Sequence, residues 1–212
     1  MAMPATHIRF AETLAQRLGV QDLSAYLSGT IYPDSRWMTG IDRKKTHARR
    51  VLDPNFPSDD FTMGWHVHCR CDHNQGAIFK QLLGDLSDLS PDDRWFLFSA
   101  AKTIQDMNDA LEGRIFENLW MLTNEATPNG EDRESVVAFY DIIRSTYKKE
   151  APVRLQDYVG LWAAVGFDGT RIQKIVKQVE RILADRQLVG RLTGVFDQMV
   201  DNWENVPGVS FS

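Results

Sequence analysis

Apolar residues recur every three or four positions along most of the chain, the spacing that places them on one face of a helix. The first 19 residues show this pattern: Pro4 fits the first helical turn, Gly19 fits a C-terminal cap, and His7 falls on the apolar face between them. No segment alternates apolar and polar residues over enough positions to predict a β-strand. The sequence therefore predicts an all-α fold, a single-domain bundle of about seven helices.

Caps and helix breakers divide the rest of the chain into further helical segments. A short helix is expected over 22–27, ending at Ser28-Gly29, and residues 29–57 are expected to form one long connection. The later helices are expected from a cap at 58–60 to Gly84, from a cap at Ser90 to a stop at 127–130, and over about 131–149, 154–165 and 168–204, with breaks at Gly166 and Gly190. We expect one domain over 1–212, with the candidate site in residues 1–110 and the C-terminal helices over 131–204 completing the core.

The composition excludes several classes of protein. Of the 212 residues, 43% are hydrophobic and 25% are charged, and the chain has neither an apolar run of about 18 residues nor a secretory signal at its start. The two cysteines, Cys69 and Cys71, are two residues apart, so on a helix their side chains point to opposite sides and cannot form an ordinary disulfide with each other. We therefore expect a cytoplasmic protein with no transmembrane segment.

The charge distribution limits the partners. The formal net charge is -5 and the basic residues form no long block, which argues against nucleic acid as the main partner. The oligomeric state stays open, with a homodimer among the alternatives.

Histidine is distributed unevenly, because all five histidines lie in the first 73 residues. His68 and Asp72 are four residues apart, so on a helix their side chains point the same way and can bind one ion. His7 lies on an apolar face, where a buried imidazole needs a polar partner. Asp34 follows Tyr32-Pro33, a rigid turn that can hold a carboxylate toward a site. Each residue also has a structural explanation: a helix-surface hydrogen bond, a satisfied core histidine or an ordinary turn.

The order of these residues resembles the zinc-dependent phospholipase C family, which is related to the fungal zinc-dependent single-strand nucleases. The family pattern is an early His, then Gly-x-x-x-Pro-Asp, a Thr-His pair and Gly-x-x-x-His-x-x-x-Asp. The matching segments, in chain order, are Thr6-His7, Gly29-Thr30-Ile31-Tyr32-Pro33-Asp34, Thr46-His47 and Gly64-Trp65-His66-Val67-His68-Cys69-Arg70-Cys71-Asp72. The resemblance implies an all-α fold and the metal ligands His7, Asp34, His47, His68 and Asp72.

The sequence also departs from that family. The secreted phospholipases complete a three-metal cluster with further histidines and a freed N-terminal amine, whereas no histidine follows His73 here. We therefore expect one or two divalent ions, zinc first, with manganese, iron and magnesium as alternatives. Asp106 is expected to add a carboxylate ligand; the alternative is an ion pair with Lys102 on the same helix.

A divalent ion with open coordination positions activates water near neutral pH and polarises a phosphoryl oxygen. The predicted function is therefore a metal-dependent hydrolase that acts on a small phosphorylated substrate. Asp34 and Asp72 are expected to bind the metal and also to take part in catalysis. Arg36 is expected to neutralise the phosphate, with Arg43 and Lys44 as alternatives.

Two other functions stay open. HD phosphohydrolases are also helical metal enzymes, but their mark is an adjacent His-Asp dyad, and here the order is Asp72-His73. The second alternative is a helical interaction domain, either with structural histidines or with a bound metal and no catalysis. Metal stoichiometry and turnover of phosphoesters distinguish these alternatives.

Overall fold

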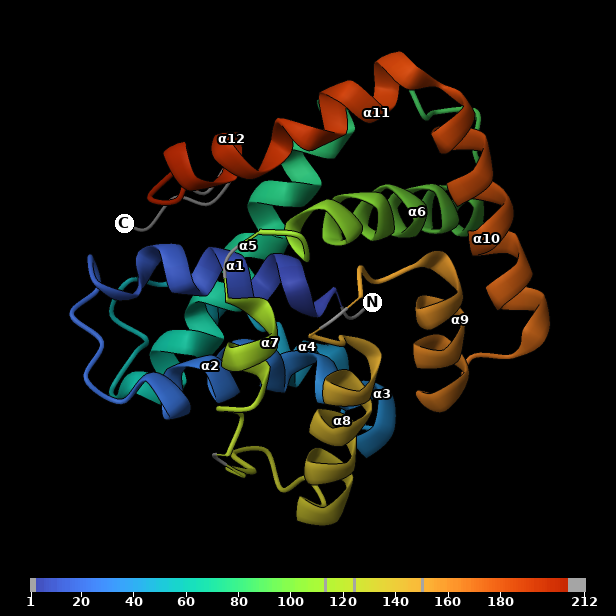
Figure 1. Cartoon of the computed structure of the whole chain (residues 1–212). Helices are drawn as coiled ribbons and strands as arrows, with labels where there is room; N and C mark the ends of the chain where they lie inside the picture. Colours follow the sequence, from blue (N-terminus) through green and yellow to red (C-terminus); the bar gives the residue numbers. More distant parts are fainter. Residues whose placement is uncertain (1–2, 113, 124, 150, 206–212) are drawn as a thin grey trace.

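The computed structural model describes residues 3–112, 114–123, 125–149 and 151–205, and most of them are helical (Figure 1). The helices, with two 3₁₀ helices labelled η, are α1 (Pro4–Ala15), α2 (Leu23–Ile31), η1 (Tyr32–Ser35), α3 (Arg36–Thr39), α4 (Arg43–Thr46), η2 (Arg49–Leu52), α5 (Asp60–Leu82), α6 (Pro91–Asp109), α7 (Ile115–Leu119), α8 (Arg133–Thr146), α9 (Leu155–Ala164), α10 (Gly169–Ala184), α11 (Arg186–Thr193) and α12 (Val195–Asp201). The described residues contain no strand, only an isolated β-bridge between Lys148 and Ala151. The predicted all-α class is confirmed.

The helix starts follow the caps in the sequence. The Asp59 carboxylate accepts a hydrogen bond from the backbone N–H of Thr62, and the Thr62 hydroxyl accepts one from the backbone N–H of Asp59, which forms a capping box for α5. Ser90 caps α6, with Pro91 in the first turn. Gly166 has a φ of 91°, in the left-handed region that favours glycine, and it separates α9 from α10.

Residues 29–57 contain several short helices instead of the one long connection expected from the sequence. Helix α2 continues through Gly29 to Ile31, and η1, α3, α4 and η2 then follow as single turns as far as Leu52. Pro33 lies in the first turn of η1, where its fixed φ is compatible with a tight helix. The chain that carries Asp34 and His47 is therefore largely ordered into short helices.

Two of the expected long helices are interrupted, so the structure has more helices than the seven expected. Helix α6 ends at Asp109, and Leu111, whose spacing fits the apolar stripe, is 62% exposed. Within 168–204 the breaks fall at Asp185 and Gly194, whereas Gly190 lies inside α11. Periodicity continues across such breaks, because the segments on both sides of each break bury an apolar face in the same core.

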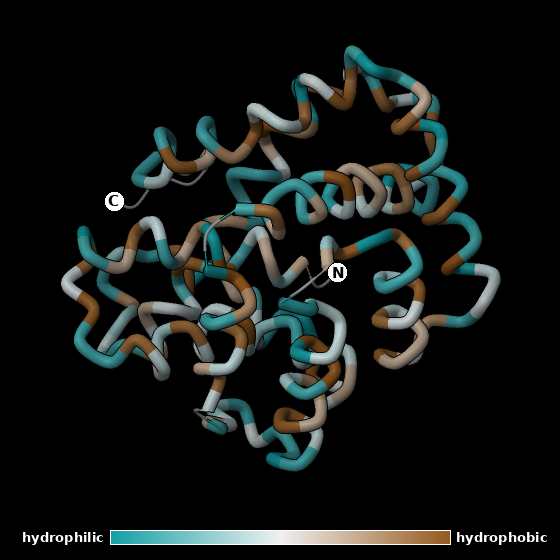
Figure 2. Tube along the Cα trace, viewed as in Figure 1, coloured by the Kyte–Doolittle hydropathy of each residue, from teal (hydrophilic) through white to brown (hydrophobic). Residues whose placement is uncertain are grey.

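One main apolar core lies beneath most of the helices, and Figure 2 shows its hydrophobic positions alternating with hydrophilic ones along each helix. Helices α10 to α12 pass around the outside of α6 and α5 (Figure 1). The two ends of the chain share the core, since the ring of Phe10 in α1 packs edge-to-face on Phe196 in α12 with centroids 6.5 Å apart. No helix among the described residues is long and apolar enough to cross a membrane.

Candidate metal centre

The site is built on a close crossing of α2 and α5. A Cβ atom at Gly29 would lie 1.9 Å from the carbonyl oxygen of Phe61, and one at Gly64 would lie 1.9 Å from the carbonyl oxygen of Tyr26. Glycine alone permits this approach, so the two helices meet backbone to backbone. The crossing brings the carbonyl of Thr30 in α2 to the imidazole of His68 in α5.

Two buried histidines present the same ring nitrogen to the site. Nδ1 of His7 lies 2.9 Å from the carbonyl oxygen of Met3, and Nδ1 of His68 lies 2.8 Å from the carbonyl oxygen of Thr30. Because a carbonyl oxygen can only accept a hydrogen bond, each Nδ1 carries a hydrogen, which leaves Nε2 as the ring nitrogen that can bind a metal. A fixed partner on the second nitrogen is typical of metal-ligating histidines.

His47 approaches from the turn after α4. Its Nδ1 lies 2.9 Å from the hydroxyl of Thr46, and its Nε2 lies 3.3 Å from Nε2 of His68. Burial lowers the pKa of His47, and burial together with the neighbouring His7 lowers the pKa of His68 well below its usual value. Both imidazoles are therefore neutral at physiological pH, the form in which histidine binds metal.

Asp34 in η1 completes a group of three ligands. One carboxylate oxygen of Asp34 and one ring nitrogen each of His47 and His68 all lie within 4.8 Å of one another. Atoms bound tetrahedrally to a single zinc ion at about 2.1 Å are about 3.4 Å apart, so these ligands would have to move closer by up to about 1.4 Å to enclose one ion. This buried cluster, here called the ligand group, can hold a metal ion.

His7 and Asp72 lie beside the ligand group. The rings of His7 and His68 are stacked, with centroids 4.0 Å apart and 8° between their planes. Nε2 of His7 is buried without a hydrogen-bond partner among the described residues and lies 3.6 Å from Oδ1 of Asp72. The other oxygen of Asp72 lies 3.6 Å from Nε2 of His47. All five residues implied by the family resemblance are thus brought together, three of them in the ligand group itself.

Lys102 in α6 is a site residue that the sequence analysis does not identify. Its Nζ lies 2.5 Å from Oδ1 of Asp72, the oxygen that faces His7. Burial would raise the pKa of Asp72, but Lys102 and the neighbouring histidines hold it well below its usual range, so this carboxylate stays ionised. In the sequence, the spacing of Lys102 indicates only a possible ion pair with Asp106 on the same helix. A contact between residues 30 positions apart leaves no local signal.

Asp106 does not join the site, which corrects its assignment as a metal ligand. Its Oδ1 accepts a hydrogen bond from the backbone N–H of Thr6 at 2.7 Å. Its Oδ2 accepts hydrogen bonds from the hydroxyls of Tyr147 and Tyr158, both at 2.5 Å. Through these hydrogen bonds Asp106 in α6 connects the start of α1 to the end of α8 and to α9. Asp106 is therefore a structural carboxylate.

Basic side chains line a pocket of about 270 Å³ beside the ligand group. The residues that matter for its chemistry are Asp34, Arg36, Arg43, His47, Asp72 and Lys102. The guanidinium of Arg36 lies 4.0 Å from the ring centre of Trp37, and its buried Nε has no hydrogen-bond partner in the described part of the chain. The pocket therefore combines possible metal ligands with donors suited to an anion. Lys44, the other basic candidate, is exposed and does not line this pocket.

Comparison with known proteins gives no relative: no protein-family model, no curated protein and no solved structure matches the chain. The functional argument therefore depends on the geometry of the site. The resemblance to the zinc-dependent phospholipases C stays a prediction from the four sequence motifs.

Proposed function

We propose that this chain is a metal-dependent phosphoester hydrolase whose ion is held by Asp34, His47 and His68. The observation that carries the proposal is that three ligand atoms lie within 4.8 Å of one another, and that two of these ligands, Asp34 and His47, line a pocket together with the cationic side chains of Arg36 and Lys102. Two imidazoles and one carboxylate favour zinc, with manganese and iron next. Magnesium ranks lower, because it prefers oxygen ligands.

A divalent ion bound here would supply a Lewis acid for a phosphoryl oxygen and activate water at neutral pH. The surrounding residues bind and orient the substrate. Arg36 and Arg43 can donate hydrogen bonds to the phosphate oxygens that do not take part in bond cleavage, and Nζ of Lys102 adds a third positive charge. Asp72 stays ionised beside Lys102, so its role is to position that ammonium group and His47.

We propose one ion per chain, because the most suitable place for a second ion already faces a positive charge. A second ion would use Nε2 of His7 and Oδ1 of Asp72, which lie 3.6 Å apart outside the ligand group. Nζ of Lys102 lies on that same oxygen. The ammonium group therefore supplies the charge that a second ion would bring, and its repulsion disfavours that ion.

The test is elemental analysis of the purified chain, followed by turnover assays. We expect about one ion per chain in the wild type and none in a double variant, Asp34→Asn with His68→Gln. The matched control is His73→Gln, which changes a histidine on the same helix outside the ligand group and should retain the ion. Hydrolysis of p-nitrophenyl phosphate and of bis(p-nitrophenyl) phosphate is then measured with zinc, manganese or iron.

Each result decides a different part of the proposal. A wild-type chain that refuses all three metals would overturn it. A chain that binds one ion through these residues but hydrolyses neither ester, with any of the metals, would favour the metal-binding interaction domain instead. Turnover that disappears in the double variant and survives in His73→Gln would support the hydrolase.

A further inference from the structure

The pocket at the metal centre adjoins a larger cleft of about 650 Å³ between α5 and α6. The cleft shares Arg43, His47, Asp72, Phe98 and Lys102 with the smaller pocket, so the two lie next to each other. Its volume is within the range of sites that hold small organic molecules and is much larger than a phosphate ion requires. The part of the cleft beyond the metal centre therefore has room for the body of a substrate.

The floor of the cleft is one face of α5. Asp72, Gly76 and Lys80 are spaced by four residues, so they lie in line along the helix, and about 12 Å separates the first from the last. A Cβ atom at Gly76 would meet no atom within 4 Å. Gly64 on the same helix lacks a side chain because the α2 backbone lies against it, whereas at Gly76 the missing side chain leaves open space in the cleft.

The charge of the cleft is opposite to that of the whole chain. Among the described residues that line it, Asp72 is the single acidic residue, and its charge is paired with Lys102. Arg43 and Lys80 add positive charge, although the chain has a formal net charge of -5. Such a cleft attracts anions in preference to neutral or cationic molecules.

We infer that this cleft binds an organic phosphate that carries a second anionic group. Its phosphoryl group lies at the metal centre, its body lies over Gly76 against the ring of Phe98, and its second anionic group reaches Lys80. The inference rests on the proposed function for the position of the first phosphoryl group. The open floor at Gly76 and the position of Lys80 are independent of it.

The test compares three probes by isothermal titration calorimetry with the metal-loaded full chain: inorganic phosphate, hexyl phosphate and 1,6-hexanediol bisphosphate. The last two have the same six-carbon body and differ in the second phosphate. We expect the bisphosphate to bind about twofold to fivefold more tightly than hexyl phosphate, the effect of one exposed ion pair. In Lys80→Gln this preference should disappear while the affinity for inorganic phosphate is unchanged.

A second variant tests the floor of the cleft. Gly76→Leu has space for its side chain and should fold, so we expect it to weaken both organic probes at least about tenfold and to leave inorganic phosphate within about twofold. If phosphate binds but the organic probes bind no better and respond to neither variant, this inference is wrong and the proposed function stands. If none of the three probes binds the metal-loaded chain, both proposals are wrong.

Discussion

At the scale of single residues, the site depends on which ring nitrogen each histidine uses. Carbonyl oxygens at Met3 and Thr30 hold the hydrogen on Nδ1 of His7 and His68, so both Nε2 atoms are left as ligands. The four motifs in the sequence identify these histidines, but they carry no information about their backbone partners. Lys102 shows the same limit more strongly, because the carboxylate that it contacts lies on another helix.

The position of Lys102 predicts a change in metal stoichiometry. In Lys102→Met the ammonium group is lost while Asp72 and the unpartnered Nε2 of His7 remain, so we expect the ion content to rise from about one toward two per chain at saturating zinc. Elemental analysis after gel filtration measures the ratio. Lys45→Met, which removes an exposed charge on α4, is the control and should stay at one. An unchanged ratio in Lys102→Met would contradict the role assigned to this ammonium group.

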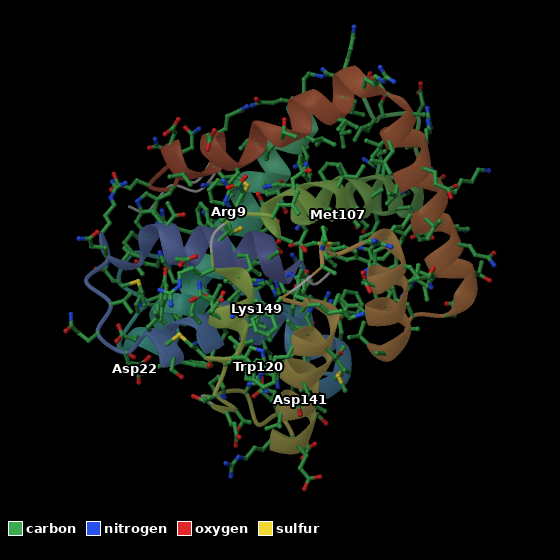
Figure 3. All side chains as sticks on the ribbon, in the orientation of Figure 1. Arg9, Asp22, Met107, Trp120, Asp141 and Lys149 are labelled. Atoms are coloured by element: carbon green, nitrogen blue, oxygen red, sulfur yellow. The ribbon has the colours of Figure 1, made fainter. Side chains whose placement is uncertain are left out.

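A second prediction at this scale concerns Asp109. Burial raises the pKa of its carboxyl group from 3.8 to about 6, and the nearby Asp106 adds to this effect, although Arg9 (labelled in Figure 3) lies 2.6 Å away and opposes it. The folded protein therefore binds this proton more tightly than the unfolded chain does. The resulting stabilisation is complete below pH about 4 and is lost as the pH rises through about 6.

Chemical denaturation of the wild type and of Asp109→Asn between pH 4 and 7 measures this effect. The free energy of unfolding of the wild type, relative to the variant, should fall by about 2 kcal/mol over that range. The asparagine has no proton to lose, and it can still accept the hydrogen bond from Arg9. A difference that does not change with pH would show that Asp109 titrates at its ordinary value.

At the scale of helices, the crossing of α2 and α5 decides whether the ligands meet. Gly64→Ala places a methyl group against the backbone of Tyr26, and we expect a loss of about 2–4 kcal/mol in unfolding free energy together with weaker metal binding. Gly76→Ala, twelve residues further along the same helix, meets no atom and should raise the unfolding free energy by about 0.5–1 kcal/mol. Similar effects of the two substitutions in urea denaturation would contradict the close crossing.

Helix starts and helix ends differ in how well the sequence predicts them. Ser90 with Pro91 and the Asp59 capping box begin helices as expected, because a cap is a contact between residues close in sequence. The end of α6 at Asp109 and the break at Asp185 are missed. The segments on both sides of each break bury apolar residues in the same core, so the helical spacing of apolar residues in the sequence does not change at the break.

At the scale of the whole molecule, the candidate metal centre joins parts of the chain that are far apart in sequence. Its residues come from α1, from η1, from α5 and from the turn that follows α4, while Lys102 comes from α6. Asp106 makes a separate connection, in which one buried carboxylate links α1 to Tyr147 and Tyr158. An ion at the ligand group therefore connects segments that the unfolded chain leaves apart.

Metal removal should consequently destabilise the whole fold. At a free ion concentration of 100 times the dissociation constant, binding to the folded state alone contributes about 2.7 kcal/mol, and a chelator should remove this contribution. Denaturation curves with and without chelator measure the difference, and the Asp34→Asn variant should show almost none. Equal shifts in the two proteins would mean that the chelator acts elsewhere.

The sequence by itself determined the helical class, the starts of the main helices and the group of histidines and aspartates from which the site is made. These features depend on periodicity, on local capping contacts and on residue type, all of which can be read within a few positions. The tertiary structure decided which three residues form the ligand group, that Lys102 neutralises Asp72, and that Asp106 is structural. These outcomes depend on the distance between helices, which is set by the backbone contact at Gly29 and Gly64 and by packing across the whole core.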